Sequence, residues 1–216
     1  MTWAAFFETY APLLLSGLWA TIRICFLATL LALPLGLGVA LLLRNPARAL
    51  RGLARLYVEV MRGTPILVVL FLLYYGGPSI GLVLEAEPVG IIGLGLYGAG
   101  YFAEIFRAGL QSIPQGQREA ARMLGIPSWR ILVRIELPQM QRLVTPPVIN
   151  QVIVLIKESA ALSIITVPEL TKIGAQIANE TFAVIEPYLA VALLYWLLIE
   201  LIASAGHWLE RKAKHG

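Results

Sequence analysis

The sequence of 216 residues contains no aspartate, a single cysteine and only two histidines, and charged residues make up 14% of it. The lone thiol, Cys25, cannot form an internal disulfide, and no cysteine and histidine cluster has the spacing of a zinc site. His207 and His215 both lie near the C-terminus, outside any catalytic or metal-ligand pattern. The G-x-x-x-x-G-K-[ST] phosphate loop is also missing. These absences argue against an enzyme, a metal-binding protein and a nucleotide hydrolase.

Apolar residues, in contrast, make up 58% of the chain, where an average soluble domain has about 45–50%. Long apolar stretches cover residues 12–43, 54–77, 89–110, 143–166 and 182–206. Each contains the roughly 20 residues that a membrane crossing needs, and a helix satisfies its own backbone in lipid. The sequence therefore predicts an all-α polytopic membrane protein. Residues 12–210 would form one transmembrane domain with five spanning helices, preceded by an outer N-terminal segment over residues 1–11.

Basic residues gather in alternate segments between these stretches. Twelve of the 17 lie within residues 44–55, 112–142 and 211–216. The positive-inside rule places these segments in the cytoplasm, with the N-terminus outside and the C-terminal tail inside. The first basic residue is Arg23, so no basic region of a signal peptide precedes the first stretch, which we expect to be a retained span. The net charge of +4 thus reflects topology rather than a nucleic-acid partner.

Residues 112–142 form the largest cytoplasmic loop and carry helix signals of their own. Residues 117–124 are good helix formers, and their apolar members offer one small face: Ala120, Ala121, Met123 and Leu124. Gly125 is placed to end this helix. Ser128 is placed to cap a second short helix over residues 129–136. On these grounds alone, the first helix either docks into a groove on a partner or covers the helix bundle.

The same loop resembles the EAA-x3-G-x9-I-x-LP signature of ABC importer membrane subunits, which it matches at Glu119, Ala120, Ala121, Gly125, Ile135, Leu137 and Pro138. Two other segments are similar to those of the polar amino-acid permeases of that class. Residues 59–65 fit the pattern E-x-x-R-G-T-P, and residues 101–109 fit Y-x-x-E-x-x-R-G-G with Ala108 in place of a glycine. The resemblance extends over most of the chain.

This resemblance implies a bacterial inner-membrane permease with the type I ABC importer fold. Two such subunits, identical or closely related, would form a pore for a polar amino acid or a derivative such as an opine. Two ATPase subunits, which bind ATP and magnesium, would dock on the coupling residues Glu119, Ala120, Ala121, Leu124 and Gly125. An extracytoplasmic binding protein would deliver the substrate, and this chain would hold no cofactor. Alternatives are an ABC permease for another small solute such as methionine, and an ion-coupled secondary transporter, although no repeat typical of the latter is evident.

Charged residues also lie within the predicted spans, where each costs of the order of 2.5–3.5 kcal/mol. Glu59 and Arg62 are three residues apart near the cytoplasmic end of the second span, and Glu104 and Arg107 repeat this spacing in the third. Each pair is predicted to close on one helix face and to fix packing near the cytoplasmic mouth. A role as a gate is the alternative. Arg23 has no obvious partner nearby in the sequence.

The fourth span contains a polar set that we interpret as a substrate pathway: Asn150, Lys157, Glu158 and Ser159. Asn150 and Lys157 are seven residues apart and therefore share a helix face. Glu158 would pair with the ammonium group of an amino acid, and Lys157 with its carboxylate. In the alternative, these adjacent side chains point about 100° apart and form separate structural pairs. The family usually has K-[DN]-[TS]-S here, so the glutamate leaves the substrate preference open.

Overall fold

A computed structural model describes residues 3–215, and this part of the chain is built of helices with no strand. The α-helices are α1 (Trp3–Leu42), α2 (Arg48–Gly63), α3 (Ile66–Phe71), α4 (Ala86–Gln111), α5 (Gln115–Met123), α6 (Ser128–Ile131), α7 (Leu137–Glu158), α8 (Leu170–Thr181) and α9 (Ile185–His215). They are extended by π segments at Leu72–Gly76 and Leu132–Glu136, and by 3-10 segments at Gly77–Ile80 and Ser159–Ile165. The all-α prediction is confirmed.

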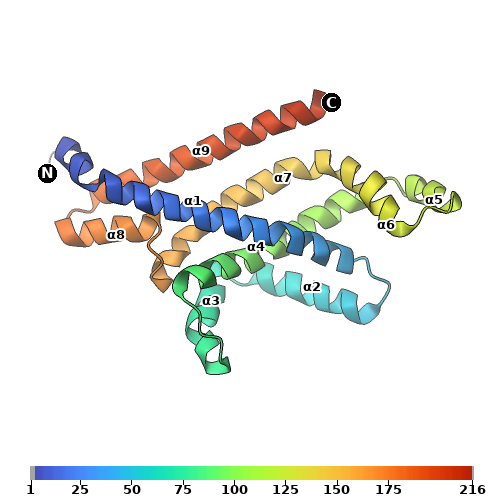
Figure 1. The fold of residues 1–216 in the computed structure, drawn as a ribbon, viewed down its shortest axis with the longest axis horizontal. Coiled ribbons are helices and arrows are strands. Elements are labelled where there is room, and N and C mark those ends of the chain that lie inside the picture. The colour runs from blue at the N-terminus through green and yellow to red at the C-terminus, as the bar shows by residue number, and fades with distance from the viewer. Residues whose placement is uncertain (1–2, 216) are drawn as a thin grey trace.

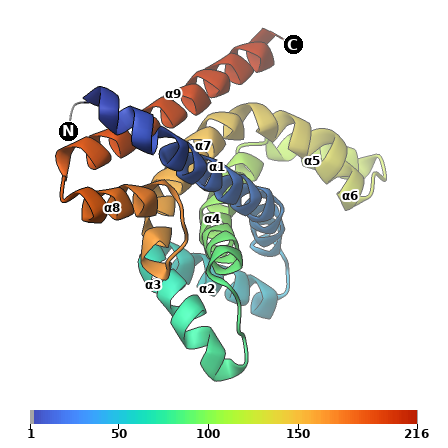
Figure 2. The ribbon, with the colours of Figure 1, turned by 60° about the vertical axis from the view of Figure 1, so that its left-hand side comes forward.

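The long helices α1, α4, α7 and α9 run along the length of the molecule (Figure 1). α1 packs along α4, α4 against α7, and α7 against α9. Within the described residues, 4 helical segments are long and apolar enough to cross a membrane, and the bent pair of α2 and α3 is a candidate for the fifth span. The N-terminus and α8 lie at one end, whereas α5 and α6 project from the other end (Figure 1, Figure 2).

α1 begins earlier than the sequence suggested. Its 40 residues start at Trp3 and correspond to a length of about 60 Å, twice the roughly 30 Å of a bilayer core. Phe6 and Leu14 in its first half are buried against α8 and α9, in a cluster that includes Ile173. Most of the predicted N-terminal segment over residues 1–11 is therefore part of this packed helix.

α4 is the central helix of the bundle. In the most apolar 18-residue stretch of α4, 67% of the residues are buried, against 22–33% in the corresponding stretches of the other candidate spans. Gly36 of α1 lies so close to α4 that a Cβ atom there would be 2.6 Å from Cβ of Phe102 and 3.1 Å from the backbone nitrogen of Ala103. Arg23, which lacked an evident partner in the sequence, pairs with α4 through Glu87, with 2.7 Å between Nη2 and Oε2.

The second apolar stretch does not form one straight helix. α2 ends at Gly63, Thr64 and Pro65 are extended, and α3 continues at an angle of 108°. The proline has no N–H to donate, and it also disfavours the helical conformation of the residue before it. The predicted second span over residues 54–77 is therefore two helices joined at Thr64 and Pro65, either a broken span or a re-entrant element.

The fourth stretch, in contrast, belongs to a longer helix than expected. α6, the π segment Leu132–Glu136 and α7 follow each other without a break, so the predicted second loop helix and the fourth span are one element. The N–H of Leu137 bonds to the carbonyl of Leu132, in the π pattern, just before Pro138 interrupts the regular ladder. The prediction that Ser128 caps this helix is wrong. Ser128 is instead the first helical residue, and no side chain caps the start of the helix.

α8 was missed in the sequence, although its buried leucine and isoleucines follow a helical spacing. Its N-cap is Glu169, a fully buried residue whose carboxylate accepts the N–H groups of Thr171 and Lys172 and the hydroxyl of Tyr195. The N–H of Leu170, the first residue of α8, donates to Oγ1 of Thr21 in α1. Buried polar groups thus fix α8 between α1 and α9.

The close contact of α1 with α4 predicts different effects for two glycines of α1. Gly36→Ala should lower the free energy of unfolding by about 1 kcal/mol or more, because overpacking outweighs the gain in helix propensity. Gly38→Ala adds the same methyl group where no atom beyond the adjacent part of α1 lies within 4 Å, and it should be neutral or stabilising. Thermal unfolding in detergent compares the two variants. Equal midpoints would contradict the close approach at Gly36.

Candidate functional site

α5 is a well-delimited helix in the loop between α4 and the α6–α7 helix. Pro114 precedes it, and Gly125 follows it in the left-handed conformation, with a φ of 71°. The N–H of Gly125 bonds to the carbonyl of Arg122 at 2.9 Å, and that of Ile126 bonds to Ala121 at 3.1 Å. This pair of bonds is a Schellman motif, which requires a residue that tolerates positive φ. Gly125 therefore ends α5 where the sequence predicted.

The apolar residues of α5 do not share one face. Ala121 is only 4% exposed and faces the protein itself, whereas Ala120 is exposed. Met123 and Leu124, at 89% and 80% exposed, lie uncovered at the end of the helix. The expected single face is therefore wrong, because Ala121 serves internal packing. Large apolar side chains exposed in this loop are Met123, Leu124 and Trp129 of α6, and we refer to these three residues as the docking surface.

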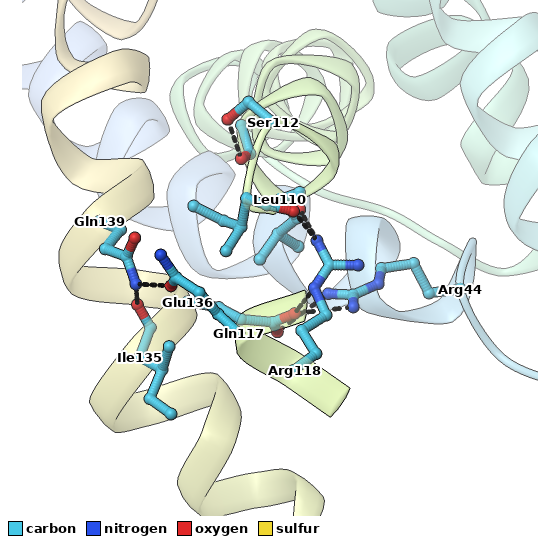
Figure 3. Close-up of polar contacts among 10 residues, drawn as sticks. Arg44, Leu110, Ser112, Gln117, Arg118, Ile135, Glu136 and Gln139 are labelled. Carbon is cyan, nitrogen blue, oxygen red and sulfur yellow. Dashed lines mark hydrogen bonds and ion pairs between the residues drawn. The ribbon is translucent and has the colours of Figure 1, made fainter. Parts of the chain in front are cut away.

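Glu136, the last residue of the π segment, forms ion pairs with two arginines, one of them on α5 (Figure 3). Its side chain is 5% exposed. Arg44, which follows α1, donates from Nη1 to Oε2 at 3.1 Å and from Nη2 to Oε1 at 2.9 Å. Arg118 of α5 places Nε 2.7 Å from Oε1, an ion-pair contact without an aligned hydrogen bond. We call Arg44, Glu136 and Arg118 the ion triad.

The inward face of α5 has further polar anchors. Nη2 of Arg118 donates to the carbonyl oxygens of Leu110 and Ile113 at the end of α4 (Figure 3). Nε2 of Gln139 in α7 donates to Oε1 of Gln117 at 2.6 Å. Sequence reasoning missed the ion triad because Arg44 and Glu136 are 92 residues apart. The one available signal was an acidic residue in a loop rich in arginine.

A charged cavity lies between α2 and α4, near the end of α1. It has a volume of about 410 Å³ and is lined by Leu43, Arg55, Val58, Glu59, Arg62, Glu104, Arg107 and Gln111. The four residues that the sequence predicted as gate or packing pairs therefore line one space. Polar groups dominate its wall, so it can hold water or a polar solute.

The ion pairs in this cavity differ in part from those expected. Glu104 and Arg107 are in contact, with 2.6 Å between Oε2 and Nη2. Among the described residues, no ion pair joins Glu59 to Arg62. Arg62 instead extends across to Glu104 on the other helix, at 3.9 Å, and lies over the ring of Tyr101. Side chains of α2 reach α4 because the two helices pack together, which local spacing does not reveal.

The predicted substrate residues of α7 are not brought together. Asn150 and Lys157 are both exposed, in keeping with a shared face, and Glu158 is partly buried. Ser159 is fully buried and donates to the carbonyl of Ile156 at 2.7 Å. Within the described residues, no ion pair includes Lys157 or Glu158. Only Asn150 and Lys157 thus lie on a surface that is open in this chain.

Sequence comparisons place these features among known proteins. A family model described as a binding-protein-dependent transport system inner membrane component matches residues 32–215. YckA of Bacillus subtilis (strain 168), a probable amino-acid ABC transporter permease protein, is 38% identical over 204 residues, which cover 94% of this chain and 90% of YckA. The arginine transport system permease protein ArtQ of the same organism is 32% identical, with 94% of this chain and 93% of ArtQ covered.

Solved structures show the same fold. The crystal structure of an amino acid ABC transporter with histidines gives a TM-score of 0.89 at 33% identity, and the match covers 98% of this chain and 99% of that chain. An inward-facing structure of the MetNI methionine ABC transporter gives a TM-score of 0.83 at 22% identity, covering 95% of this chain and 98% of that chain. The second likeness is one of fold alone.

The cavity contacts predict unequal roles for its two glutamates. Glu104→Gln should destabilise the protein by about 1 kcal/mol, a modest value because water screens the partly exposed pair. That loss corresponds to a fall of about 2–4 °C in the unfolding midpoint. Glu59→Gln removes an equal charge from the same cavity but breaks no ion pair, and its midpoint should not change. Thermal unfolding in detergent measures both, and a larger fall for Glu59→Gln would refute the assigned contacts.

Proposed function

This chain belongs to the family of binding-protein-dependent transport system inner membrane components, and on that premise we propose that it is the permease subunit of an ATP-driven amino-acid importer. The observation that supports coupling to an ATPase is the docking surface. α5 is anchored from within by Arg118 and Gln117, while Met123 and Leu124 remain exposed. A rigid helix with uncovered apolar side chains suits a groove on a partner protein.

The energy source is proposed to be a separate ATPase, because this sequence has no phosphate loop of its own. ATP and magnesium would bind that ATPase. A second permease subunit, identical or closely related, would complete the pore, and an extracytoplasmic binding protein would deliver the substrate. Exposed Asn150 and Lys157 on α7 suit a surface that faces such a second subunit or the pore, since polar groups are costly in lipid.

The proposed orientation is supported by the distribution of basic residues along the molecule. Arginines gather in the segment from the loop after α1 into the first half of α2 and in the loop with α5 and α6, and both segments lie at the end away from the N-terminus (Figure 1). The positive-inside rule makes this end cytoplasmic and puts the N-terminus outside. The docking surface would then face the compartment that contains ATP, as coupling requires.

The proposed substrate is a polar amino acid. The support comes from the names of the relatives, which include an arginine permease and a probable amino-acid permease that the chain matches over nearly its whole length. The charged cavity is compatible with a zwitterion, since arginines and glutamates line the same space. Methionine is less well supported, because the methionine transporter shares only the fold at 22% identity.

Transport should require ATP hydrolysis. The permease, purified with its ATPase and reconstituted into liposomes with its binding protein, should take up labelled amino acid when ATP is enclosed. Uptake should stop with a hydrolysis-deficient ATPase, which is the matched control. A thermal-shift screen of the binding protein identifies the amino acid to use. Uptake driven by an ion gradient without nucleotide would instead show a secondary transporter.

The ATPase should dock at the end of α5. Leu124→Glu and Met123→Glu should each weaken co-purification of the ATPase roughly tenfold or more, because a charge replaces an apolar anchor of the kind worth about 2 kcal/mol at interfaces. Phe182→Glu is the control, since Phe182 is 94% exposed and follows α8 at the opposite end of the molecule. If Phe182→Glu reduced co-purification as strongly as Leu124→Glu, the docking surface would be wrongly placed.

A further inference from the structure

The ion triad joins elements that the chain connections do not hold rigidly. α5 is connected to α4 through Pro114 and to α6 through Gly125 and Pro127, with no regular helix across either junction. Arg118, on the inward face, reaches the carboxylate of Glu136 at 2.7 Å. A displacement of α5 is therefore passed on by side-chain contacts at least as directly as by the backbone.

The second arginine of the triad extends this contact to α1. Arg44 holds both oxygens of Glu136, and a bidentate pair of this kind fixes direction as well as distance. Glu136 is 5% exposed, so its charge has little access to water. Because it is the shared partner of both arginines, Glu136 is the point at which α1 and α5 are tied to the α6–α7 helix (Figure 3).

The anchor points of the triad border the charged cavity. Arg44 follows Leu43, which lines that cavity beside α2. Arg118 also binds the carbonyl oxygens of Leu110 and Ile113, which flank another lining residue, Gln111. The triad thus includes Arg44, the residue next to Leu43 in the cavity wall, and its Arg118 also binds Leu110, the residue next to Gln111 in that wall.

We propose that Glu136 is a positioning residue for transport, and that the Arg44–Glu136–Arg118 triad carries movement of the ATPase-bound α5 to the rim of the charged cavity. This role rests on the proposed function, since it assumes an ATPase on the docking surface. Breaking the triad should leave the ATPase bound, because Met123 and Leu124 are untouched. It should separate ATP hydrolysis from substrate movement.

Two substitutions test this role in the reconstituted complex with its ATPase and binding protein. Glu136→Gln keeps the shape of the side chain but removes the charge that both arginines share. Arg44→Gln releases only α1, because the Arg118–Glu136 contact and the carbonyl contacts at the end of α4 remain. The measured quantity is amino acid taken up per ATP hydrolysed, together with ATPase retained on the purified complex.

Both variants should retain the ATPase and lower uptake per ATP roughly tenfold, within the range in which mutations change coupling between sites. The matched controls are Arg48→Gln, after the same loop, and Arg134→Gln, on the same helix as Glu136. Both side chains are exposed and neither forms an ion pair within the described residues. Their uptake per ATP should equal that of the unmodified protein, which a general effect of lost charge would not allow.

Unchanged uptake per ATP in Arg44→Gln would overturn the role of the triad, whatever Glu136→Gln does. If Glu136→Gln does not assemble, Arg44→Gln alone decides, since it leaves the buried carboxylate paired with Arg118. A fall in uptake that is matched by an equal fall in hydrolysis would also overturn it, because coupling would then be intact. Absence of ATP-dependent uptake in the unmodified complex would instead refute the proposed function itself.

Discussion

The structure depends on one constraint, that backbone groups away from water must find hydrogen-bond partners within the protein. Long uninterrupted helices satisfy it, and each departure from them has a local remedy. At Thr64 and Pro65 the chain turns where proline has no N–H to lose. Where α8 begins inside the protein, Thr21 accepts its first N–H group and the carboxylate of Glu169 accepts the next two. The breaks between helices therefore meet the same hydrogen-bonding requirement as the spans.

At the end of the molecule that carries α5, polar contacts rather than apolar packing fix the position of the helix. α5 has nine residues, too few for a stable isolated helix. Only Ala121 among them is buried, so apolar packing contributes little to its position. The Schellman motif at Gly125, the contacts of Arg118 and the bond to Gln117 fix it instead. Because its orientation is set from the inward side, its outward side is free to meet a partner.

The sequence predicted what depends on local pattern. Apolar length located the spans, and Gly125 marked the end of α5. Contacts between residues on different elements could not be predicted. Arg62 and Glu104 are an example, because they come close only when α2 packs on α4. The inward orientation of Ala121 was missed for a related reason. A helix of two or three turns has no long period from which its buried side can be deduced.

The chemistry of the triad explains why it suits transmission better than stabilisation. Burying charges costs solvation, and replacing such a group by apolar side chains is often neutral or favourable for stability. What Glu136 adds is geometry, since a bidentate arginine pair has one preferred direction, whereas apolar side chains can slide past one another. The net positive charge of the triad is offset by the carbonyl oxygens at the C-terminus of α4, where the helix dipole is negative. A displaced α5 therefore encounters a directional resistance, because Arg118 ties it to the end of α4 and to Glu136, whose carboxylate also binds Arg44 after α1.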